Sequence, residues 1–189
     1  MELCLVGVQA GTREALIAAA LELLEADGEE PSLRAVARAT GVSAMAPYNH
    51  FPDKAALLAA VANHGFQMLA KILADADDRA DAREALIAQG VAFVGFAQAN
   101  PALFRLMYSH QYGNADTEAV RATYAILAER VTSISPNNAS AGVLACRSLV
   151  QGMATIALNG RLAPSGPTDI AIAVQMLVRG LAAGTEEQR

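Results

Sequence analysis

Residues 32–54 read SLRAVARATGVSAMAPYNHFPDK, and this stretch decides the fold predicted for the chain. The side chain of Ser32 can cap the free amides of a first short helix. Gly41 can adopt the left-handed backbone conformation in which helices often end. Ser43 then predicts the cap of a second short helix over 44–50. Two short helices joined by a tight turn that contains glycine form the layout of a helix-turn-helix.

Hydrogen-bond donors gather where the second short helix ends and a long third helix begins. Tyr48, His50 and Lys54 stand beside the start of this long helix, whose free amides also favour anions. Asp53 is the expected cap of the long helix, and Phe51 is expected in the core. An ordinary helical corner would explain the glycine turn alone, but it would not explain the grouped donors. The grouping therefore favours a cluster that contacts phosphate.

Apolar residues recur at helical spacing along the rest of the chain, and no stretch shows the alternation of a strand. The fold class predicted is all-α, with about nine helices. A helix-turn-helix domain of three helices is expected over 1–58, its last helix continuing as a connector to about residue 74. A helical bundle is expected over 75–189. Within it, 86–97 and 139–159 are apolar on nearly every side, which predicts buried or interface helices.

The composition is consistent with a helical protein outside the membrane. Alanine supplies 42 of 189 residues, so the apolar share of 53% contains many small side chains. Arg147 interrupts the longest apolar run, so no membrane-spanning helix and no membrane partner are expected. The start of the chain lacks the basic flank of a signal peptide, so we expect a cytoplasmic protein. Cys4 and Cys146 have no metal-binding or redox spacing.

The net charge is −5, and residues 1–60 alone carry four basic and eight acidic residues. By charge alone, a polyanionic partner would not be expected. Binding of DNA therefore has to depend on a few donors on one surface.

Over roughly residues 12–74 the chain resembles the tetracycline-repressor (TetR) family of transcriptional regulators. The matching residues are Thr40-Gly41-Val42-Ser43, Tyr48, His50-Phe51 and Lys54-Ala55-Ala56-Leu57-Leu58. The resemblance implies that residues 44–49 lie in the major groove of DNA. It also implies that Tyr48, His50 and Lys54 hold the DNA backbone, and that a homodimer binds a near-palindromic site.

The second half resembles a TetR-type ligand-binding domain, of the kind named for a tryptophan and a His-Gly pair. The similarity lies in Pro101 to Met107, in Ser148 to Ala154 and in Asn159 to Leu162. Arg147 stands where this family usually has tryptophan, and Gln151 stands where it usually has histidine. The resemblance implies a helical bundle that binds a small molecule.

The reading helix has few side chains that can recognise bases. Asn49 can pair bidentately with adenine, and the small or apolar residues around it can touch thymine methyl groups. We expect Arg34 to reach a phosphate, with Arg13 as a further candidate. We expect the acidic residues of this domain to lie mostly away from DNA, namely Glu14, Glu22, Glu25, Asp27, Glu29 and Glu30. The candidate DNA-binding residues are Arg34, Thr40, Ser43, Ala44, Met45, Ala46, Tyr48, Asn49, His50 and Lys54.

Bulky residues of the second half either form its core or line a cavity, with Gln151 or Thr155 as a polar anchor. A cavity of this kind would take a small and mainly apolar ligand. The last two helices, over 139–159 and 170–181, are the expected dimer interface. The candidate ligand-binding residues are Phe93, Phe96, Phe104, Met107, Tyr108, Tyr124, Gln151 and Thr155.

The predicted function is that of a homodimeric, ligand-responsive transcriptional regulator. We expect a repressor that binds an operator on double-stranded DNA and is released from it by a small effector. One alternative is a family member that binds a ligand or partner protein with little DNA binding. Another is a helical enzyme acting on a small molecule near Tyr108, His110 and Tyr112. No nucleophile motif, cofactor motif or metal-ligand spacing is present, so we expect no catalysis, no cofactor and no metal.

Overall fold

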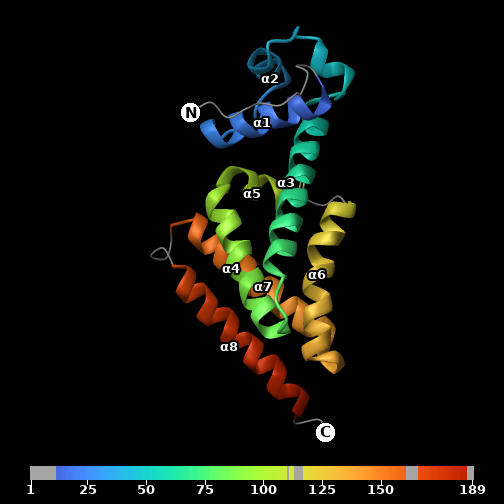
Figure 1. Cartoon of the computed structure of the whole chain (residues 1–189). Helices are drawn as coiled ribbons and strands as arrows, with labels where there is room; N and C mark the ends of the chain where they lie inside the picture. Colours follow the sequence, from blue (N-terminus) through green and yellow to red (C-terminus); the bar gives the residue numbers. More distant parts are fainter. Residues whose placement is uncertain (1–11, 110, 113–116, 161–165, 187–189) are drawn as a thin grey trace. The chain divides into compact units, whose positions relative to one another are not determined.

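A computed structural model describes residues 12–109, 111–112, 117–160 and 166–186. Within these ranges the chain forms eight α-helices and two short 3-10 helices and contains no strand (Figure 1), which confirms the all-α prediction. The α-helices are α1 (Arg13–Asp27), α2 (Leu33–Thr40), α3 (Lys54–Ala76), α4 (Ala82–Ala99), α5 (Pro101–Met107), α6 (Glu118–Ile134), α7 (Ala139–Leu158) and α8 (Pro167–Glu186).

The chain divides into two compact units, and each is described by itself. The first unit comprises Met1–Gly65 together with Ala102–Ala115, and the second comprises Phe66–Pro101 together with Asp116–Arg189. The segment Ala102–Ala115 thus belongs with the helix-turn-helix residues, although sequence reasoning grouped it with the second half.

Local capping residues define the helices of the first unit. The Thr12 hydroxyl accepts a hydrogen bond from the Ala15 amide at 3.2 Å and starts α1, which ends at Gly28 in the left-handed conformation. The Ser32 hydroxyl likewise accepts from the Ala35 amide at 3.2 Å and starts α2, which packs against α1. Each cap satisfies backbone groups that would otherwise lack partners.

The predicted reading helix over 44–50 is wrong in type and length. The structure has a 3-10 helix over Ala46–Asn49 that no side chain caps, so Ser43 contributes only its carbonyl, which accepts from the Ala46 amide at 3.0 Å. Pro47 explains the difference. Proline has no amide to donate to the preceding turn, and it disfavours the α conformation in the residue before it.

The long helix α3 begins as predicted, because a carboxylate oxygen of Asp53 accepts from the Ala56 amide at 2.8 Å. Apolar residues recur along α3 at helical spacing, and Leu57, Leu58, Val61 and Leu69 among them are fully buried. Ile72 continues this spacing but is 37% exposed, and Leu73 is buried in its place. Leu73 follows Leu69 by four residues, so it continues the same helix face as well as Ile72 would.

Helix α4 is central in the second unit, since it packs against α6, α7 and α8. A common core joins these four helices, and each supplies at least one fully or nearly buried side chain. The residues of this core are Leu86, Val131, Cys146, Val174 and Val178. The prediction that 86–97 forms a buried helix is thereby confirmed.

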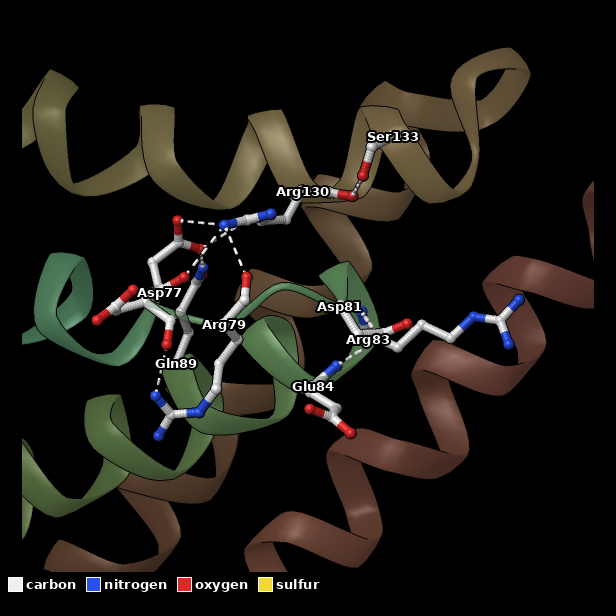
Figure 2. Close-up of polar contacts among 9 residues, drawn as sticks. Asp77, Arg79, Asp81, Arg83, Glu84, Gln89, Arg130 and Ser133 are labelled. Carbon is white, nitrogen blue, oxygen red and sulfur yellow. Dashed lines mark hydrogen bonds and ion pairs between the residues drawn. The ribbon is translucent and has the colours of Figure 1, made fainter.

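A polar cluster fixes the end of α3 against α4 and α6 (Figure 2). The Arg130 guanidinium donates to both carboxylate oxygens of Asp77, at 2.8 and 2.9 Å, and to its backbone carbonyl at 3.1 Å. The buried Gln89 amide donates to the same carboxylate at 2.5 Å. Charged residues between α3 and α4 thus take part in packing, although a run of charges between two helices is usually solvated. Hydrogen bonding by Arg130, the largest effect, lowers the pKa of Asp77 below its ordinary value.

Within the described residues, two helical segments are long and apolar enough, by length and composition alone, to cross a membrane, and the bent pair α4 and α5 would make a third if it formed one span. For α3, half of the apolar window is buried inside the protein, whereas for Pro136–Leu158 only 17% is buried. Most of the apolar surface of α7 therefore lacks cover from its own chain.

Candidate DNA interface

The turn between α2 and the 3-10 helix depends on Gly41. Its φ of 71° is a left-handed value that other residues adopt at a cost, and its amide donates to the carbonyls of Ala37 and Arg38. A β-carbon on Gly41 would meet no atom within 4 Å, so glycine is needed for its backbone angle rather than for space. The Val42 amide also donates to the Ala37 carbonyl, at 3.0 Å, which closes the turn.

The 3-10 helix is attached through two buried residues. Pro47 is buried, and its carbonyl accepts from the amides of His50 and Phe51 at 3.0 and 2.9 Å. Phe51 is 2% exposed, which confirms that it lies in the core. The residues that carry recognition are thus held by neighbours that stay inside.

The side chains proposed to face bases lie on the surface around these two anchors. Met45 is 68% exposed, and Ala44 and Asn49 are exposed, while Ala46 is half-buried. Because Met45 stays exposed, its apolar surface contributes little to folding. It is well suited to thymine methyl groups in a groove.

The side chains proposed to hold the DNA backbone are also accessible. Tyr48 is 43% exposed, and Arg34, Ser43, His50 and Lys54 are exposed. All five can donate hydrogen bonds, which phosphate oxygens accept.

Thr40 has a different part in this surface. Thr40 is half-buried, and its hydroxyl donates to the backbone carbonyl of Val36 at 2.9 Å. The carbonyl of Ala37 is a second acceptor, 3.2 Å from the same hydroxyl oxygen. A hydroxyl has one proton, so in this rotamer Thr40 secures the end of α2 and has none left for a phosphate.

Arg13, which sequence reasoning weighed as a further phosphate contact, belongs to the same region. Its guanidinium carbon lies 5.3 Å from the centre of the Phe51 ring, within the range of a cation–π contact. Arg13 is exposed, so this contact positions a positive charge next to the residue that follows the 3-10 helix.

One expectation about the acidic residues is wrong. Glu30 does not lie away from the candidate interface, because its carboxylate is 3.0 Å from the ammonium of Lys54. The side chains of Lys54 and Glu30 are 45% and 41% exposed. A predicted phosphate contact is therefore already paired with a carboxylate.

The acidic residues also bind the segment Ala102–Ala115 to the rest of the first unit. The Glu25 carboxylate accepts from the amides of Ala102 and Leu103 at 3.3 and 2.7 Å. Glu30 accepts a side-chain hydrogen bond from Tyr112, and burial, followed by the charge of Glu30, raises the pKa of this phenol. No local signal in the sequence could have found these contacts, because Glu25 and Leu103 are 78 residues apart.

The eight candidate ligand-binding residues fall into different units. Phe104, Met107 and Tyr108 lie in the first unit and the other five in the second. The remaining five comprise the buried Phe93 and Phe96, the half-buried Tyr124 and Gln151, and the exposed Thr155.

Within the second unit, two contacts involve candidate ligand-binding residues. The Thr155 hydroxyl donates to the Gln151 carbonyl in its own helix at 2.8 Å. The guanidinium carbon of Arg147 lies 3.7 Å from the centre of the Tyr124 ring. A single pocket that contains all eight residues is thus not apparent within either unit.

Catalytic and metal-binding arrangements are not apparent in the part of the chain that the structure describes. No group of three or more metal-ligating side chains occurs there. Burial raises the pKa of the Cys146 thiol to about 11, so this thiol is uncharged near neutral pH. His110, Arg161 and Leu162, named above, lie outside the described residues.

Comparison with known proteins assigns both halves of the chain. Residues 16–61 match the family model of bacterial regulatory proteins of the tetR family, and residues 86–181 match the tetracyclin repressor-like C-terminal domain. No curated protein has significant sequence similarity to the chain.

Solved structures agree along nearly the whole length. A protein of unknown function from Rhodococcus sp. RHA1 is 33% identical with a TM-score of 0.78, covering 96% of this chain and 100% of its own. A TetR variant from Acinetobacter baumannii AYE in complex with minocycline is 25% identical with a TM-score of 0.65, covering 94% and 98%. A putative transcriptional regulator from Pseudomonas aeruginosa PAO1 shares the fold at 19% identity and a TM-score of 0.74, covering 93% and 92%.

Proposed function

Because this chain belongs to the TetR family of bacterial transcriptional regulators, we propose that it is a homodimeric repressor of a palindromic operator. A small, mainly apolar effector bound by the second unit releases it from double-stranded DNA. The protein works in the cytoplasm, has no membrane partner, uses no cofactor and catalyses no reaction.

The observation that carries this proposal is that buried and exposed side chains are interspersed around the 3-10 helix. Pro47 and Phe51 are buried, whereas Met45, Tyr48 and Asn49 point their exposed side chains outward from the same short element. Exposed apolar side chains that lie close together are typical of interaction sites, and Met45 and Tyr48 are 68% and 43% exposed. In a major groove these side chains meet methyl groups and phosphates.

Contacts to the DNA backbone outnumber contacts to bases. Asn49 is the residue of the 3-10 helix that can pair bidentately with a base. Four side chains contact the DNA backbone, those of Arg34, Tyr48, His50 and Lys54. Ala44 and Ala46 offer only methyl groups. Sequence preference therefore also depends on the shape and deformability of the operator.

The dimer forms through α7 and α8, which pack against each other. Leu144 on α7 is 65% exposed, and Ile172 and Met176 on α8 are 50% and 69% exposed. Ile172 and Met176 are four residues apart, so they share one face of α8. A second copy of the chain covers this face, and it places two reading elements at the spacing of two half-sites, about 34–36 Å or its multiples.

Effector binding acts as a population shift. The buried Phe93 and Phe96 of α4 belong to a helix that packs on three others, so a molecule inserted beside them changes the packing of the bundle. The complex of the related A. baumannii protein with minocycline supports a small organic effector. The effector must bind the DNA-free state more tightly than the DNA-bound state, since only differential affinity shifts the equilibrium.

Selection from a pool of randomised duplexes, followed by fluorescence anisotropy at several salt concentrations, tests the proposal. We expect a palindromic consensus and salt-dependent binding. Lys54→Ala should weaken all duplexes alike, while Lys71→Ala, an exposed lysine further along α3, should not. Asn49→Ala should relax preference at one base position by about 1–3 kcal/mol. Failure to enrich any sequence would overturn the proposal.

The position of Glu30 beside Lys54 favours one alternative, a family member that binds a ligand or partner protein with little DNA binding. In that case the wild-type protein would bind no duplex even at low salt. The selection experiment separates the two functions directly.

A further inference from the structure

Lys54 and Glu30 form an ion pair at the edge of the candidate DNA interface. Their charged atoms are 3.0 Å apart, and both side chains are close to half-exposed. Lys54 is the first residue of α3, where the proposed function brings a phosphate. A carboxylate at this distance both occupies one of the three donors of the ammonium and repels an approaching phosphate.

Glu30 is not simply a mobile surface side chain, because it has a second partner. The Tyr112 hydroxyl donates to it, and Tyr112 is 8% exposed. The Tyr112 amide in turn donates to the Ser109 hydroxyl at 3.2 Å, and that hydroxyl donates to the Leu106 carbonyl at 2.9 Å. Since Tyr112 is fixed, holding Glu30 next to Lys54 costs less conformational entropy than in an ordinary surface pair.

The segment that carries Tyr112 is itself anchored in the first unit. Glu25 accepts from the first two amides of this segment, at Ala102 and Leu103. Further along, the helix approaches Gly65 closely, since a β-carbon there would lie 2.6 Å from the sulfur of Met107. The Glu25 carboxylate and a tight packing contact thus anchor residues 102–107, which precede Ser109 and Tyr112.

From this arrangement we propose that Glu30 is a built-in competitor for the DNA phosphate at Lys54, and that Tyr112 holds it in place. The segment from Ala102 to Tyr112 then sets the affinity for DNA, since any displacement of Tyr112 changes the hold on Glu30. The inference rests on the proposed DNA-binding function. It adds a positioning role for two residues that do not themselves touch DNA.

The test compares Glu30→Gln with Glu29→Gln, a matched control that removes the same charge from the exposed neighbouring residue. Affinities are measured by anisotropy for the duplex selected above and for a random duplex of equal length. An exposed ion pair is worth a factor of about three, so Glu30→Gln should tighten binding by a dimer about tenfold at low salt. Glu29→Gln should change it by less than about twofold.

Two further measurements test whether Glu30 affects DNA binding through Lys54. In a Lys54→Ala background, Glu30→Gln should give no more than the small change expected of Glu29→Gln, because no ammonium remains to be released and only the general repulsion of phosphate is relieved. The slope of log affinity against log salt should steepen by about two for the Glu30→Gln dimer, one phosphate for each protomer. Tyr112→Phe removes only the hydroxyl and should give a smaller gain than Glu30→Gln.

The outcomes separate this inference from the proposed function. If the wild type selects a duplex and Lys54→Ala weakens it, but Glu30→Gln equals Glu29→Gln, Glu30 is no competitor and the inference fails alone. If the gain from Glu30→Gln persists without Lys54, it is a general charge effect and the inference also fails. If the wild type selects no duplex, both fail together.

Discussion

The two units expose large apolar side chains in different ways. In the first unit such side chains occur at Met45 and Tyr48, beside a short element held by buried anchors. In the second unit, exposed large apolar side chains extend over the two long helices α7 and α8, and one more lies on α3. They are Leu144 and Ile156 of α7, Ile172 and Met176 of α8, and Ile72 of α3. The first pattern fits a small reading surface, and the second fits a broad face that another protein covers.

Side-chain caps start helices in both units. In the first unit, α1, α2 and α3 begin at the side chains of Thr12, Ser32 and Asp53, respectively. In the second unit, α4 and α6 begin at the side chains of Asp81 and Thr117, whereas α7 begins at Asn138 without a side-chain cap. Local sequence thus defines helix starts in both units, and packing between helices has the larger share at α7.

The largest effect is expected from a charge on the apolar face of α8, because it would remove the difference between the two units. Met176→Glu makes this face resemble an ordinary polar surface. We expect the dimer to become a monomer in analytical ultracentrifugation. Loss of simultaneous binding to two half-sites should weaken operator binding by about 100-fold or more. Gln98→Glu, which adds the same charge at an exposed site on α4, is the control. An intact Met176→Glu dimer would refute the assignment of this face.

Glycine substitutions compare the packing of the two units. A β-carbon on Gly90 would lie 2.6 Å from a methyl of the stiff, branched Val174, so Gly90→Ala should lower the free energy of unfolding by about 1–3 kcal/mol. A β-carbon on Gly65 would lie 2.6 and 2.9 Å from the sulfur and Cγ of Met107 and 3.0 Å from Cδ1 of Leu103. Gly65→Ala should cost less than Gly90→Ala, because the unbranched Met107 side chain can move. Gly95→Ala on α4 meets no atom within 4 Å and should stabilise by about 0.4–1 kcal/mol.

Urea unfolding followed by circular dichroism at one protein concentration would rank these three variants. Equal stability of Gly90→Ala and Gly95→Ala would show that the second unit tolerates expansion between α4 and α8.

The smallest expected effect concerns the Asp77 carboxylate, which lies in the second unit. Because the pKa of Asp77 is lowered in the folded state, its stabilising contribution is present above its ordinary pKa of 3.8 and is lost as the pH falls through the lower folded value. Asp77→Asn should therefore lower the melting temperature at pH 7, by about 3 °C. The gap to wild type should close as the pH falls below 3.8 and through the lower pKa of Asp77 in the folded state.

Thermal unfolding at several pH values would check this, with Asp78→Asn at the exposed neighbouring residue as the control. A gap that is constant with pH would mean that the Asp77 charge does not stabilise the bundle.

Sequence reasoning was reliable where a structural feature depends on nearby residues. The turn at Gly41 and the caps at Ser32 and Asp53 each act over at most four residues, and all three are confirmed. The reading helix was predicted too long because the cap signal of Ser43 was weighted above the missing amide of Pro47.

Features that depend on tertiary contacts could not be read in this way. Ile72 and Leu73 both satisfy the helical spacing of α3, and only packing chooses Leu73. The pairing of Glu30 with Lys54 and Tyr112 needs the fold, since hydropathy patterns contain no information about which distant polar residues meet. The candidate ligand-binding residues were grouped by size alone, and they fall into two units.

The separation of anchors from exposed residues in the 3-10 helix has a consequence for evolution. Gly41, Pro47 and Phe51 maintain the backbone, while Ala44 and Asn49 are exposed. Substitutions at these two exposed positions change the chemistry offered to a base pair without removing a buried contact. New operator preferences are therefore accessible through single mutations at almost no cost in stability, which allows duplicated copies of the gene to diverge in their targets.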